Sequence, residues 1–325
     1  IMGKKYKRLF EKIVSEENFD IAYTKTAKDK RRSHSYLEFK EYAPLNLKLL
    51  REEVADKSYV IGDYRHFKIY DPKERLISAL PFRDRIVQHA INNVIEPIFE
   101  RTLLPYTFAC RPNKGTHAGV VYIQSCLRKP QATHTLKTDF SKYFPSIDRS
   151  RLYQEVESKI KCQDTLDLLK SIVPDTGTGL HIGSLSSQLW ANVYGGIADK
   201  FIHHELKPFA WARYMDDIVI VDNDSIKLKD MKDRLQAFSS KEMKMDFSKW
   251  SVQSVSRGVN FLGYRMWPNY KLIRKDSVRR AKKKIAKFKK LNDQEGLSRF
   301  SAAWRGHVSW ADAHNLLKTL EIEYV

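Results

Sequence analysis

The sequence predicts an α+β fold, and three observations support this class. Strand-like and helix-like segments are interspersed along the 325 residues without a regular alternation of strand and crossover helix. Several strand-like runs are short and follow one another across tight turns, which favours hairpins. The length is ample for a sizeable hydrophobic core, in one large or two to three smaller lobes.

The composition indicates the kind of partner. Lys and Arg number 58 against 39 Asp and Glu, a formal net charge of +19, which favours nucleic acid or an anionic membrane surface. No apolar run approaches the roughly 20 residues that span a bilayer, so we expect no membrane insertion. The three cysteines, Cys110, Cys126 and Cys162, form no C-x-x-C pair, which argues against a disulfide framework or a zinc ribbon.

The first elements are helices followed by a pair of strands. Residues 1–33 are basic and locally helical, and residues 58–80 read as two extended runs separated by a turn at Asp71-Pro72. Residues 83–99 carry apolar side chains at helical spacing, which predicts a helix with one buried face.

The middle of the chain alternates less regularly. Residues 134–140 read as a strand that ends at Asp139, and residues 150–173 look helical. A loop rich in glycine and serine spans 176–188 and leads into a helix through Leu189, Val193 and Ile197.

The remaining elements are two strands, a helix, a hairpin and a helical tail. The strands are predicted at 209–213 and 218–222, the helix at 225–243 and the hairpin at 259–273. From residue 275 onward, the pattern predicts two or three helices.

The segment 271–290 is strongly basic, with eleven Lys or Arg and one acid. Its apolar residues Val278, Ala281, Ile285 and Phe288 recur three or four apart, so one helix face is apolar and the remainder is basic. Such a surface is either a solvated face or a contact with nucleic-acid phosphates, and the charge density favours the contact. The side chains that we expect to contact the backbone are Arg279, Arg280, Lys282, Lys283 and Lys287.

The adjacent acids Asp216 and Asp217 lie at or beside the turn between the predicted strands 209–213 and 218–222. Aspartate is common in turns, so this pair alone does not establish a function. If the strand that ends at Asp139 lies beside them, three carboxylates converge, and carboxylate oxygens suit Mg²⁺. Two metals about 4 Å apart are the arrangement for phosphoryl and nucleotidyl transfer.

These motifs resemble those of reverse transcriptases. Y-M-D-D at 214–217 and D-F-S-K-Y-F at 139–144 resemble the family's catalytic motifs, and 75–90 and 260–264 resemble its fingers and primer grip. The resemblance implies a right-hand polymerase fold. We expect fingers at 1–105 with part of 150–185, a palm at 106–267 with the hairpin 259–273 at its edge, and a helical thumb at 268–325.

A finer resemblance concerns I-G-S-L-S-S-Q at 182–188, where group II intron-type enzymes usually carry Q-G-x-x-x-S-P. This variant is typical of reverse transcriptases of diversity-generating retroelements. The sequence segments around it are similar to those of the phage-borne member of that family. The resemblance implies an error-prone RNA-directed DNA polymerase that makes adenine-mutagenised cDNA from a template-repeat RNA. It also implies dNTPs, an RNA/cDNA duplex, two Mg²⁺ ions (or Mn²⁺ as a substitute), an accessory variability determinant protein that is pentameric, and the cytoplasm of a bacterial or phage-infected cell.

The resemblance also assigns roles to individual residues. Asp139, Asp216 and Asp217 are the expected catalytic residues; Asp139 and Asp216 would hold the metals together with the carbonyl of Phe140, with Asp217 more peripheral. Asp148 is expected to be a structural cap. The primer grip would comprise Phe261, Leu262, Gly263 and Tyr264.

Other residues are expected to bind the incoming nucleotide. Lys73 and Arg75 resemble the basic residues that bind the triphosphate, and Lys68 is a competing candidate. Phe144 would exclude a ribose 2′-hydroxyl, and Arg111 would shape the pocket. The residues of the variant loop expected there are Ile182, Gly183 and Gln188. Because Ile182 replaces a polar side chain, we hypothesise that it lowers fidelity.

Two alternatives remain at this stage. One is another prokaryotic reverse transcriptase, of the retron, antiviral-defence or group II intron type. The other is a catalytically inactive RNA-binding protein, which the complete set of aspartates disfavours and a test of metal dependence would decide.

Overall fold

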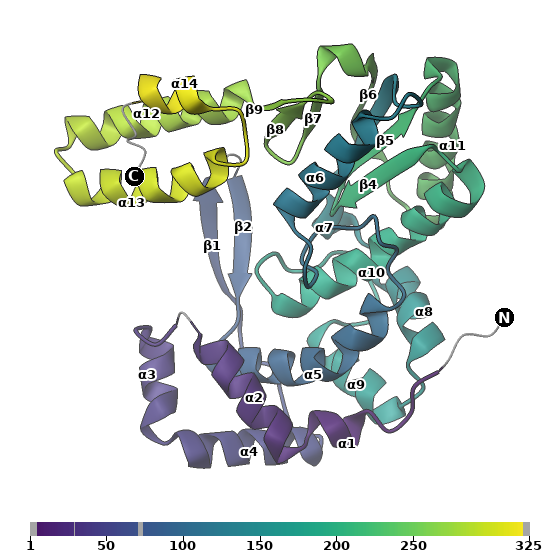
Figure 1. Cartoon of the computed structure of the whole chain (residues 1–325). Helices are drawn as coiled ribbons and strands as arrows, with labels where there is room; N and C mark the ends of the chain where they lie inside the picture. The colour runs from purple at the N-terminus through teal and green to yellow at the C-terminus, as the bar shows by residue number, and fades with distance from the viewer. Residues whose placement is uncertain (1–4, 29, 71–73, 321–325) are drawn as a thin grey trace. The chain divides into compact units, whose positions relative to one another are not determined.

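The structure, a computed structural model, describes residues 5–28, 30–70 and 74–320. The chain forms two compact units (Figure 1). The first unit comprises residues 1–105, 141–201 and 237–246, and the second comprises 106–140, 202–236 and 247–325. Helices are mixed with antiparallel sheets of two, four and three strands, so the predicted α+β class is confirmed.

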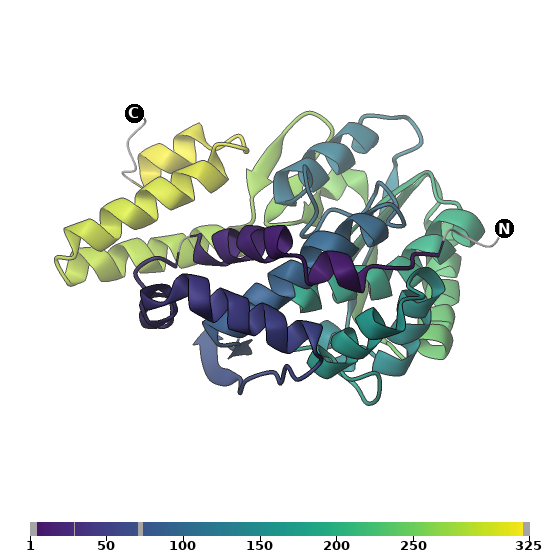
Figure 2. The same ribbon diagram turned by 90° about the horizontal axis from the view of Figure 1, so that it is seen from below.

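The first unit begins with α1 (Phe10–Ile13), α2 (Glu16–Ala27), α3 (His34–Glu41) and α4 (Ala43–Ala55), and the long helix α5 (Phe82–Glu100) follows the two-stranded ribbon (Figure 2). α1, α2 and α3 pack against α5, and α4 packs against α2 and α3. The hydroxyl of Ser15 accepts from the amide of Asn18 and begins α2, a capping arrangement that satisfies a free helix N–H. In α5, Ile86, Ile91 and Ile95 are fully buried, which confirms the buried face predicted for 83–99.

Two strands of the first unit form a separate ribbon. β1 (Arg65–Tyr70) and β2 (Glu74–Ala79) pair antiparallel with Arg65 opposite Ala79. All six side chains of β1 are exposed, so the ribbon is held by its ladder more than by a core. The turn predicted at Asp71-Pro72 lies outside the described residues.

The segment 150–173, which was predicted to be helical, forms two helices. The structure has α8 (Arg149–Lys159) and α9 (Gln163–Ile172), with residues 160–162 extended between them. Asp148 begins α8 by accepting from the amide of Arg151, as expected of a structural cap. The other helices of this unit are α7 (Tyr143–Ser146) and α10 (Leu185–Phe201).

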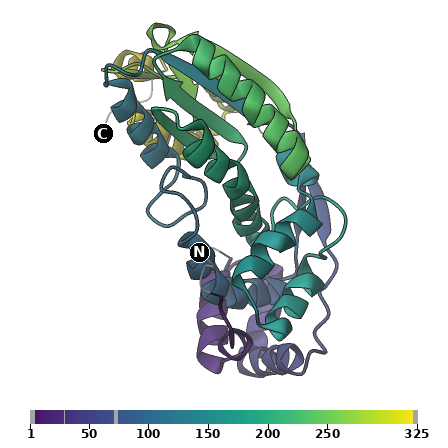
Figure 3. The ribbon, with the colours of Figure 1, turned by 90° about the vertical axis from the view of Figure 1, so that its right-hand side faces the viewer.

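The main sheet of the second unit has the strand order β4-β5-β3-β6. Its strands are β3 (His134–Phe140), β4 (Ala210–Tyr214), β5 (Asp217–Asp222) and β6 (Phe247–Ser254). α6 (Thr116–Leu127) packs against β4, and α11 (Ser225–Met243) runs along the opposite face (Figure 3). The edge strand β6 was not predicted, because its side chains are largely exposed and show no apolar alternation.

A second sheet and three helices complete this unit. The predicted hairpin at 259–273 has three strands, β7 (Val259–Phe261), β8 (Tyr264–Met266) and β9 (Lys271–Ile273). The tail forms α12 (Lys275–Lys290), α13 (Gln294–Val308) and α14 (His314–Thr319), as predicted. A π-helix at Ile202–Leu206 and a 3₁₀ turn at Val255–Arg257 connect other elements.

One hydrophobic cluster joins the main sheet to the tail. It runs from Val219 and Val221 through Phe261 and Tyr264 to Ile285 and the helices after it. Burial of this continuous apolar surface stabilises the second unit as one body. In the described part of the chain, no helix is both long and apolar enough to cross a membrane.

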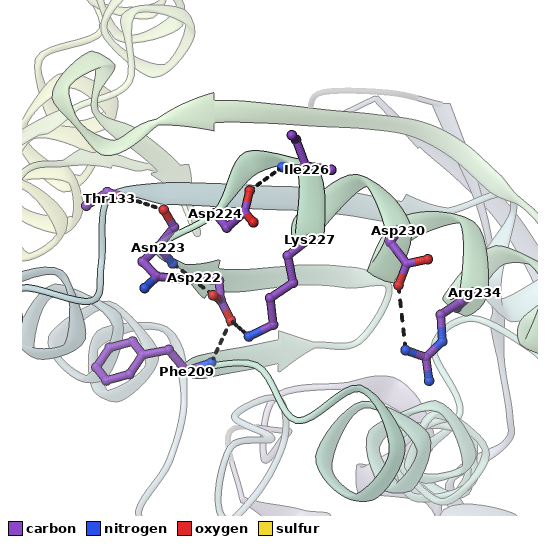
Figure 4. A network of polar contacts seen from close by, with 9 residues as sticks. All are labelled: Thr133, Phe209, Asp222, Asn223, Asp224, Ile226, Lys227, Asp230 and Arg234. Atoms are coloured by element: carbon purple, nitrogen blue, oxygen red, sulfur yellow. Dashed lines mark hydrogen bonds and ion pairs between the residues drawn. The ribbon is translucent and has the colours of Figure 1, made fainter.

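Asp222 fixes the end of β5 that is distant from the β4–β5 turn (Figure 4). Its carboxylate accepts from the amide of Asn223 at 2.9 Å, from the amide of Phe209 at 3.1 Å and from Nζ of Lys227 at 2.8 Å. These charge-assisted bonds tie the entry of β4 and the first turn of α11 to β5. This network therefore stabilises the end of the β4–β5 hairpin that lies away from the turn.

Candidate active site

The turn between β4 and β5 presents Asp216. Tyr214 pairs with Asp217, so only Met215 and Asp216 form the loop of this hairpin. Met215 has φ +54°, a conformation that glycine usually supplies at this position in two-residue turns. The side chain of the buried Arg213 donates to the carbonyl of Met215 at 3.0 Å and supports the turn. A non-glycine residue held at positive φ is typical of a functional site.

Asp139 comes to the same place from the neighbouring strand. In the register of β3 with β5, Asp139 lies opposite Asp217, and the amide of Phe140 donates to the carbonyl of Asp216 at 3.2 Å. The pairing of β3 with β6 shifts between Asp139 and Phe140, a bulge of the kind that redirects side chains beside active sites. The predicted convergence of the strand ends is therefore confirmed.

The carboxylates of this cluster disfavour one another's ionisation. Burial, and after it the neighbouring Asp139 carboxylate, raises the pKa of Asp216 to about 6. Burial also raises the pKa of Asp217, and the ammonium of Lys137 opposes this change. A site of this kind is one that a cation would stabilise.

Two lysines outside the predicted set of site residues compensate part of this charge. Nζ of Lys137 lies 3.1 Å from Oδ2 of Asp217, and Nζ of Lys249 lies 3.0 Å from Oδ2 of Asp139. Lys137 was accessible to sequence reasoning, because it precedes Asp139 by two residues and so shares its strand face. Lys249 was not, because it lies on the unpredicted strand β6.

The carboxylates of Asp139, Asp216 and Asp217 fit a divalent cation, although they do not form a complete set of metal ligands in this structure. Within the described residues, no three His, Cys, Asp or Glu side chains are gathered as a metal site. Oδ1 of Asp217 is buried without a hydrogen-bond partner in that same part of the chain, and Asp216 carries a raised pKa. Oxygen donors of this kind suit Mg²⁺, which keeps several waters and needs few carboxylates.

In the first unit, the loop that carries Ile182 is held on two sides. The carbonyl of Ile182 accepts from the amide of Ser78 on β2 at 2.8 Å. The amide group of Gln88 on α5 donates to the hydroxyl of Ser184 at 2.8 Å and accepts from the amide of Leu185 at 3.3 Å. Gly183 has φ +105°, and a Cβ there would lie 2.8 Å from Cγ2 of Ile77, so both backbone angle and space require glycine.

The ribbon distinguishes between the two basic candidates that it carries. In its register, Ile69 lies opposite Arg75 and Lys68 lies opposite Leu76, so Arg75 and Lys68 project from opposite faces. Ile77, which shares the face of Arg75, contacts the loop at Gly183. Lys68 instead forms an ion pair with Glu74 at 2.7 Å. The geometry therefore favours Arg75 over Lys68 as the basic residue on the side of the Ile182 loop.

The other nucleotide candidates are dispersed over both units. Phe144 is half-buried in α7 of the first unit, and its carbonyl accepts from the amide of Leu180 at 2.9 Å. Gln188 is exposed on α10 of the same unit. Arg111 belongs to the second unit, where Nη1 donates to the carbonyl of Thr107 at 2.9 Å. Lys73 lies outside the described residues, and the roles of all four stay predictions.

The predicted primer grip is a tight hairpin. Phe261 pairs with Tyr264 around Leu262 and Gly263, whose φ values are +51° and +90°. Positive φ at both turn positions matches a type I′ turn. The hydroxyl of Tyr264 donates to the carbonyl of His307 at 2.7 Å, which connects the hairpin to α13.

The basic helix α12 has the predicted amphipathic arrangement. Ala281 and Ile285 are buried, and Val278 and Phe288 are half-buried. The five side chains predicted to contact the nucleic-acid backbone are exposed: Arg279, Arg280, Lys282, Lys283 and Lys287. The charged face is therefore available to a polyanion.

Carboxylates at adjoining strand ends of an antiparallel sheet, two of them adjacent at one hairpin turn, define a candidate nucleotidyl-transfer centre. The comparison with protein families identifies the class of enzyme to which such a centre belongs here. The model of the family "Reverse transcriptase (RNA-dependent DNA polymerase)" matches residues 69–266, and this chain belongs to that family. The mixed helix and antiparallel sheet is the fold class of a right-hand polymerase, as the sequence predicted.

Curated relatives include bacterial and intron-encoded proteins. The protein YkfC of Escherichia coli is 24% identical over 273 residues, which cover 68% of this chain and 71% of YkfC. The nuclear intron maturase 2 of Arabidopsis thaliana is 26% identical over 39% of this chain and 19% of its own. The putative COX1/OXI3 intron 2 protein of Saccharomyces cerevisiae is 23% identical over 38% of this chain and 16% of its own.

Among solved structures, apo telomerase from Candida tropicalis has a TM-score of 0.49 at 9% identity and covers 67% of this chain and 49% of its own. Telomerase from Candida albicans with a fragment of telomeric RNA has a TM-score of 0.47 at 11% identity. This match covers 69% of the present chain and 48% of the telomerase chain. The chain thus spans about half the length of these structures and less than a fifth of the two intron proteins.

Proposed function

We propose that this chain is an error-prone RNA-directed DNA polymerase of a diversity-generating retroelement. Family membership supports RNA-templated DNA synthesis as the reaction. The observation that carries the site is the pairing of Asp139 with the β4–β5 turn, where the pKa of Asp216 is raised to about 6. The finer type is supported by the loop I-G-S-L-S-S-Q at 182–188.

We assign the chemistry to the second unit. Asp139, Asp216 and the carbonyl of Phe140 would hold two Mg²⁺ ions, which supply activation of the primer 3′-hydroxyl and stabilisation of the departing pyrophosphate. Asp217 is held by Lys137 and would act from the edge of the site. The hairpin with Phe261, Leu262, Gly263 and Tyr264 would place the primer end, and the basic face of α12 would hold the duplex by its phosphates.

We assign nucleotide selection to the first unit. Arg75 would bind the triphosphate, because guanidinium donates two parallel hydrogen bonds to phosphate oxygens. Phe144 would reject a ribose 2′-hydroxyl by its bulk. Ile182 offers no hydrogen bond to sense the geometry of the incoming pair, which narrows the free-energy difference between right and wrong nucleotides.

The partners follow the same proposal. The template would be a template-repeat RNA copied into cDNA with errors at adenines, and an accessory variability determinant protein would assist. The proposed subdomains are fingers at 1–105 with part of 150–185, a palm at 106–267 and a thumb at 268–325. The proposed location is the cytoplasm of a bacterial or phage-infected cell.

The test is primer extension on a defined RNA template with Mg²⁺ and dNTPs, followed by sequencing of the products. We expect errors concentrated opposite template adenines, and fewer of them for Ile182→Gln. Ile182→Leu is the matched control, because it keeps an apolar side chain of equal size, and it should retain the wild-type spectrum. Errors spread evenly over all four bases would assign the chain to another type of reverse transcriptase.

A further inference from the structure

The side chain of Lys137 connects the catalytic turn to the hairpin that follows it. Its Nζ lies 3.1 Å from Oδ2 of Asp217 and 2.8 Å from the carbonyl oxygen of Asn260 on β7. All three residues belong to the second unit, and each comes from a different strand. One ammonium group thus donates to a side chain of the main sheet and to the main chain of the second sheet.

The positions of both partners follow from strand geometry. Lys137 lies opposite Val219 in the register of β3 and β5, so the neighbouring Asp217 is its diagonal partner on the same face. On β7, Phe261 and Tyr264 close a two-residue turn, and antiparallel pairs alternate between bonded and non-bonded. Asn260 occupies the next, non-bonded position, so its carbonyl faces away from β8 and toward Lys137.

The contact between Lys137 and Asp217 is largely buried, which distinguishes it from a surface ion pair. The side chains of Lys137 and Asp217 are 21% and 23% exposed. For comparison, Lys249, which pairs with Asp139, is 66% exposed. An ammonium that is largely removed from water requires its partners, and removing one side of such a pair leaves the other charge uncompensated. Oδ1 of Asp217 already lacks a hydrogen-bond partner among the described residues, so Lys137 is a principal support of this carboxylate.

We propose that Lys137 is a positioning residue that fixes the hairpin 259–266 relative to the carboxylate of Asp217. The consequence of this role, alignment of a primer end with the catalytic turn, rests on the proposed polymerase function. The contacts of Lys137 with Asp217 and Asn260 are present in the protein without nucleic acid. Loss of the link lets the hairpin move against the main sheet, and small displacements of reacting groups slow a transfer reaction strongly.

The test compares Lys137→Met with Lys249→Met in the full chain. Both variants remove an ammonium from a carboxylate of the same site, but only the first also breaks a bond to the main chain of β7. Hydrogen exchange without metal or nucleic acid measures the link directly. We expect exchange in 259–266 to rise by about tenfold for Lys137→Met, because local opening becomes easier, and by less than about twofold for Lys249→Met.

Primer extension supplies the second readout. For Lys137→Met we expect kcat to fall by roughly tenfold while KM for dNTP changes by less than about threefold, since the primer and not the nucleotide is misaligned. Lys137→Arg should recover part of both effects, because a guanidinium can donate to a carboxylate and a carbonyl together.

Equal exchange in 259–266 for the two methionine variants would overturn the proposal. So would a rise for Lys137→Met that is uniform over both sheets, since that result indicates general destabilisation. If the wild-type chain extends no primer, the proposed polymerase function fails, whereas the exchange comparison still decides whether Lys137 holds the hairpin.

Discussion

Strand β5 carries an aspartate at each end, and the two ends differ in how their carboxylates are satisfied. Asp222 accepts three hydrogen bonds, from two main-chain amides and one lysine (Figure 4). Asp217 has one oxygen bonded to Lys137 and one buried oxygen with no hydrogen-bond partner in the described part of the chain. Beside it, burial and Asp139 raise the pKa of Asp216 to about 6.

This difference separates a structural from a functional use of the same residue type. At the Asp222 end, negative charge is fully compensated, so it stabilises the hairpin. At the Asp217 end, negative charge is concentrated and incompletely compensated, which costs stability and creates affinity for a cation. The same short strand thus anchors the fold at one end and presents the proposed catalytic carboxylates at the other.

The largest expected effect is on activity at the functional end. Asp216→Asn removes a carboxylate that we propose as a metal ligand, so extension should fall by roughly a thousandfold or more. Steady-state extension with Mg²⁺ measures it. Activity within tenfold of the wild type would remove Asp216 from the catalytic centre.

The structural end should respond in stability and not in chemistry. Asp222→Ala leaves the amide of Phe209 and the ammonium of Lys227 without their acceptor, so we expect a loss of about 2–4 kcal/mol in the free energy of unfolding. Urea unfolding measures this change. Activity per folded molecule should stay near that of the wild type, and a selective loss of activity would contradict the comparison.

The functional end of β5 should also show a dependence of stability on pH. The folded-state pKa of Asp216, about 6, exceeds the ordinary carboxyl value near 3.8, so the folded protein binds more protons between these values. For this group, stability therefore falls as pH rises through that window, and the cost is complete above about pH 7. Asp216→Asn should then stabilise the metal-free protein by about 3 kcal/mol at pH 7, and by less than about 1 kcal/mol at pH 4.

The measurement is the melting temperature of both proteins across this pH range with a chelator present. Asp148 provides an internal contrast. Burial of Asp148 favours a raised pKa, but hydrogen bonds from Lys244 and Ser150 outweigh it and lower the pKa of Asp148 to about 2. The stability that Asp148 contributes is therefore present above about pH 4 and is lost as pH falls toward 2. A pH-independent advantage for Asp216→Asn would show that ionisation of the Asp216 carboxyl in the folded protein is not the cause.

The smallest expected effect concerns the basic helix α12. Lys282 and Lys283 are exposed, and each lysine that neutralises a duplex phosphate should add about 0.9 to the steepness of log affinity against log salt. Replacing both by alanine should therefore make this slope shallower by about 2 units. Binding titrations at several salt concentrations measure it, and an unchanged slope would exclude both residues from phosphate binding.

Much of the second unit could be predicted from sequence. The strands at 134–140, 209–213 and 218–222 agree with β3, β4 and β5 within a residue or so, because their apolar residues are buried in the sheet. The helix at 225–243 matches α11, and the apolar stripe of α12 faces inward as expected. The aspartates that we propose as catalytic were predicted by motif, and the register brings Asp139 opposite Asp217.

What could not be predicted has physical causes. β6 is an exposed edge strand, so its membership depends on hydrogen bonds to β3 and not on an apolar pattern. The helix break at 160–162 is set by a parallel bridge between Tyr6 and Ile160, which are distant in the sequence. Lys249 lies on β6, so its pairing with Asp139 could not be predicted. The strand face that Lys137 shares with Asp139 is visible in the sequence, but its contacts with Asp217 and Asn260 depend on the pairing of other strands.

A comparison of the two ends of β5 in one assay tests the catalytic assignment most directly. Asp216→Asn and Asp222→Asn each remove one negative charge, and extension on an RNA template with Mg²⁺ is measured at equal concentrations of folded protein. We expect Asp216→Asn to abolish extension and Asp222→Asn to retain it. Equal activities of the two variants, whether both active or both inactive, would contradict the placement of the catalytic site at the Asp139–Asp216 end.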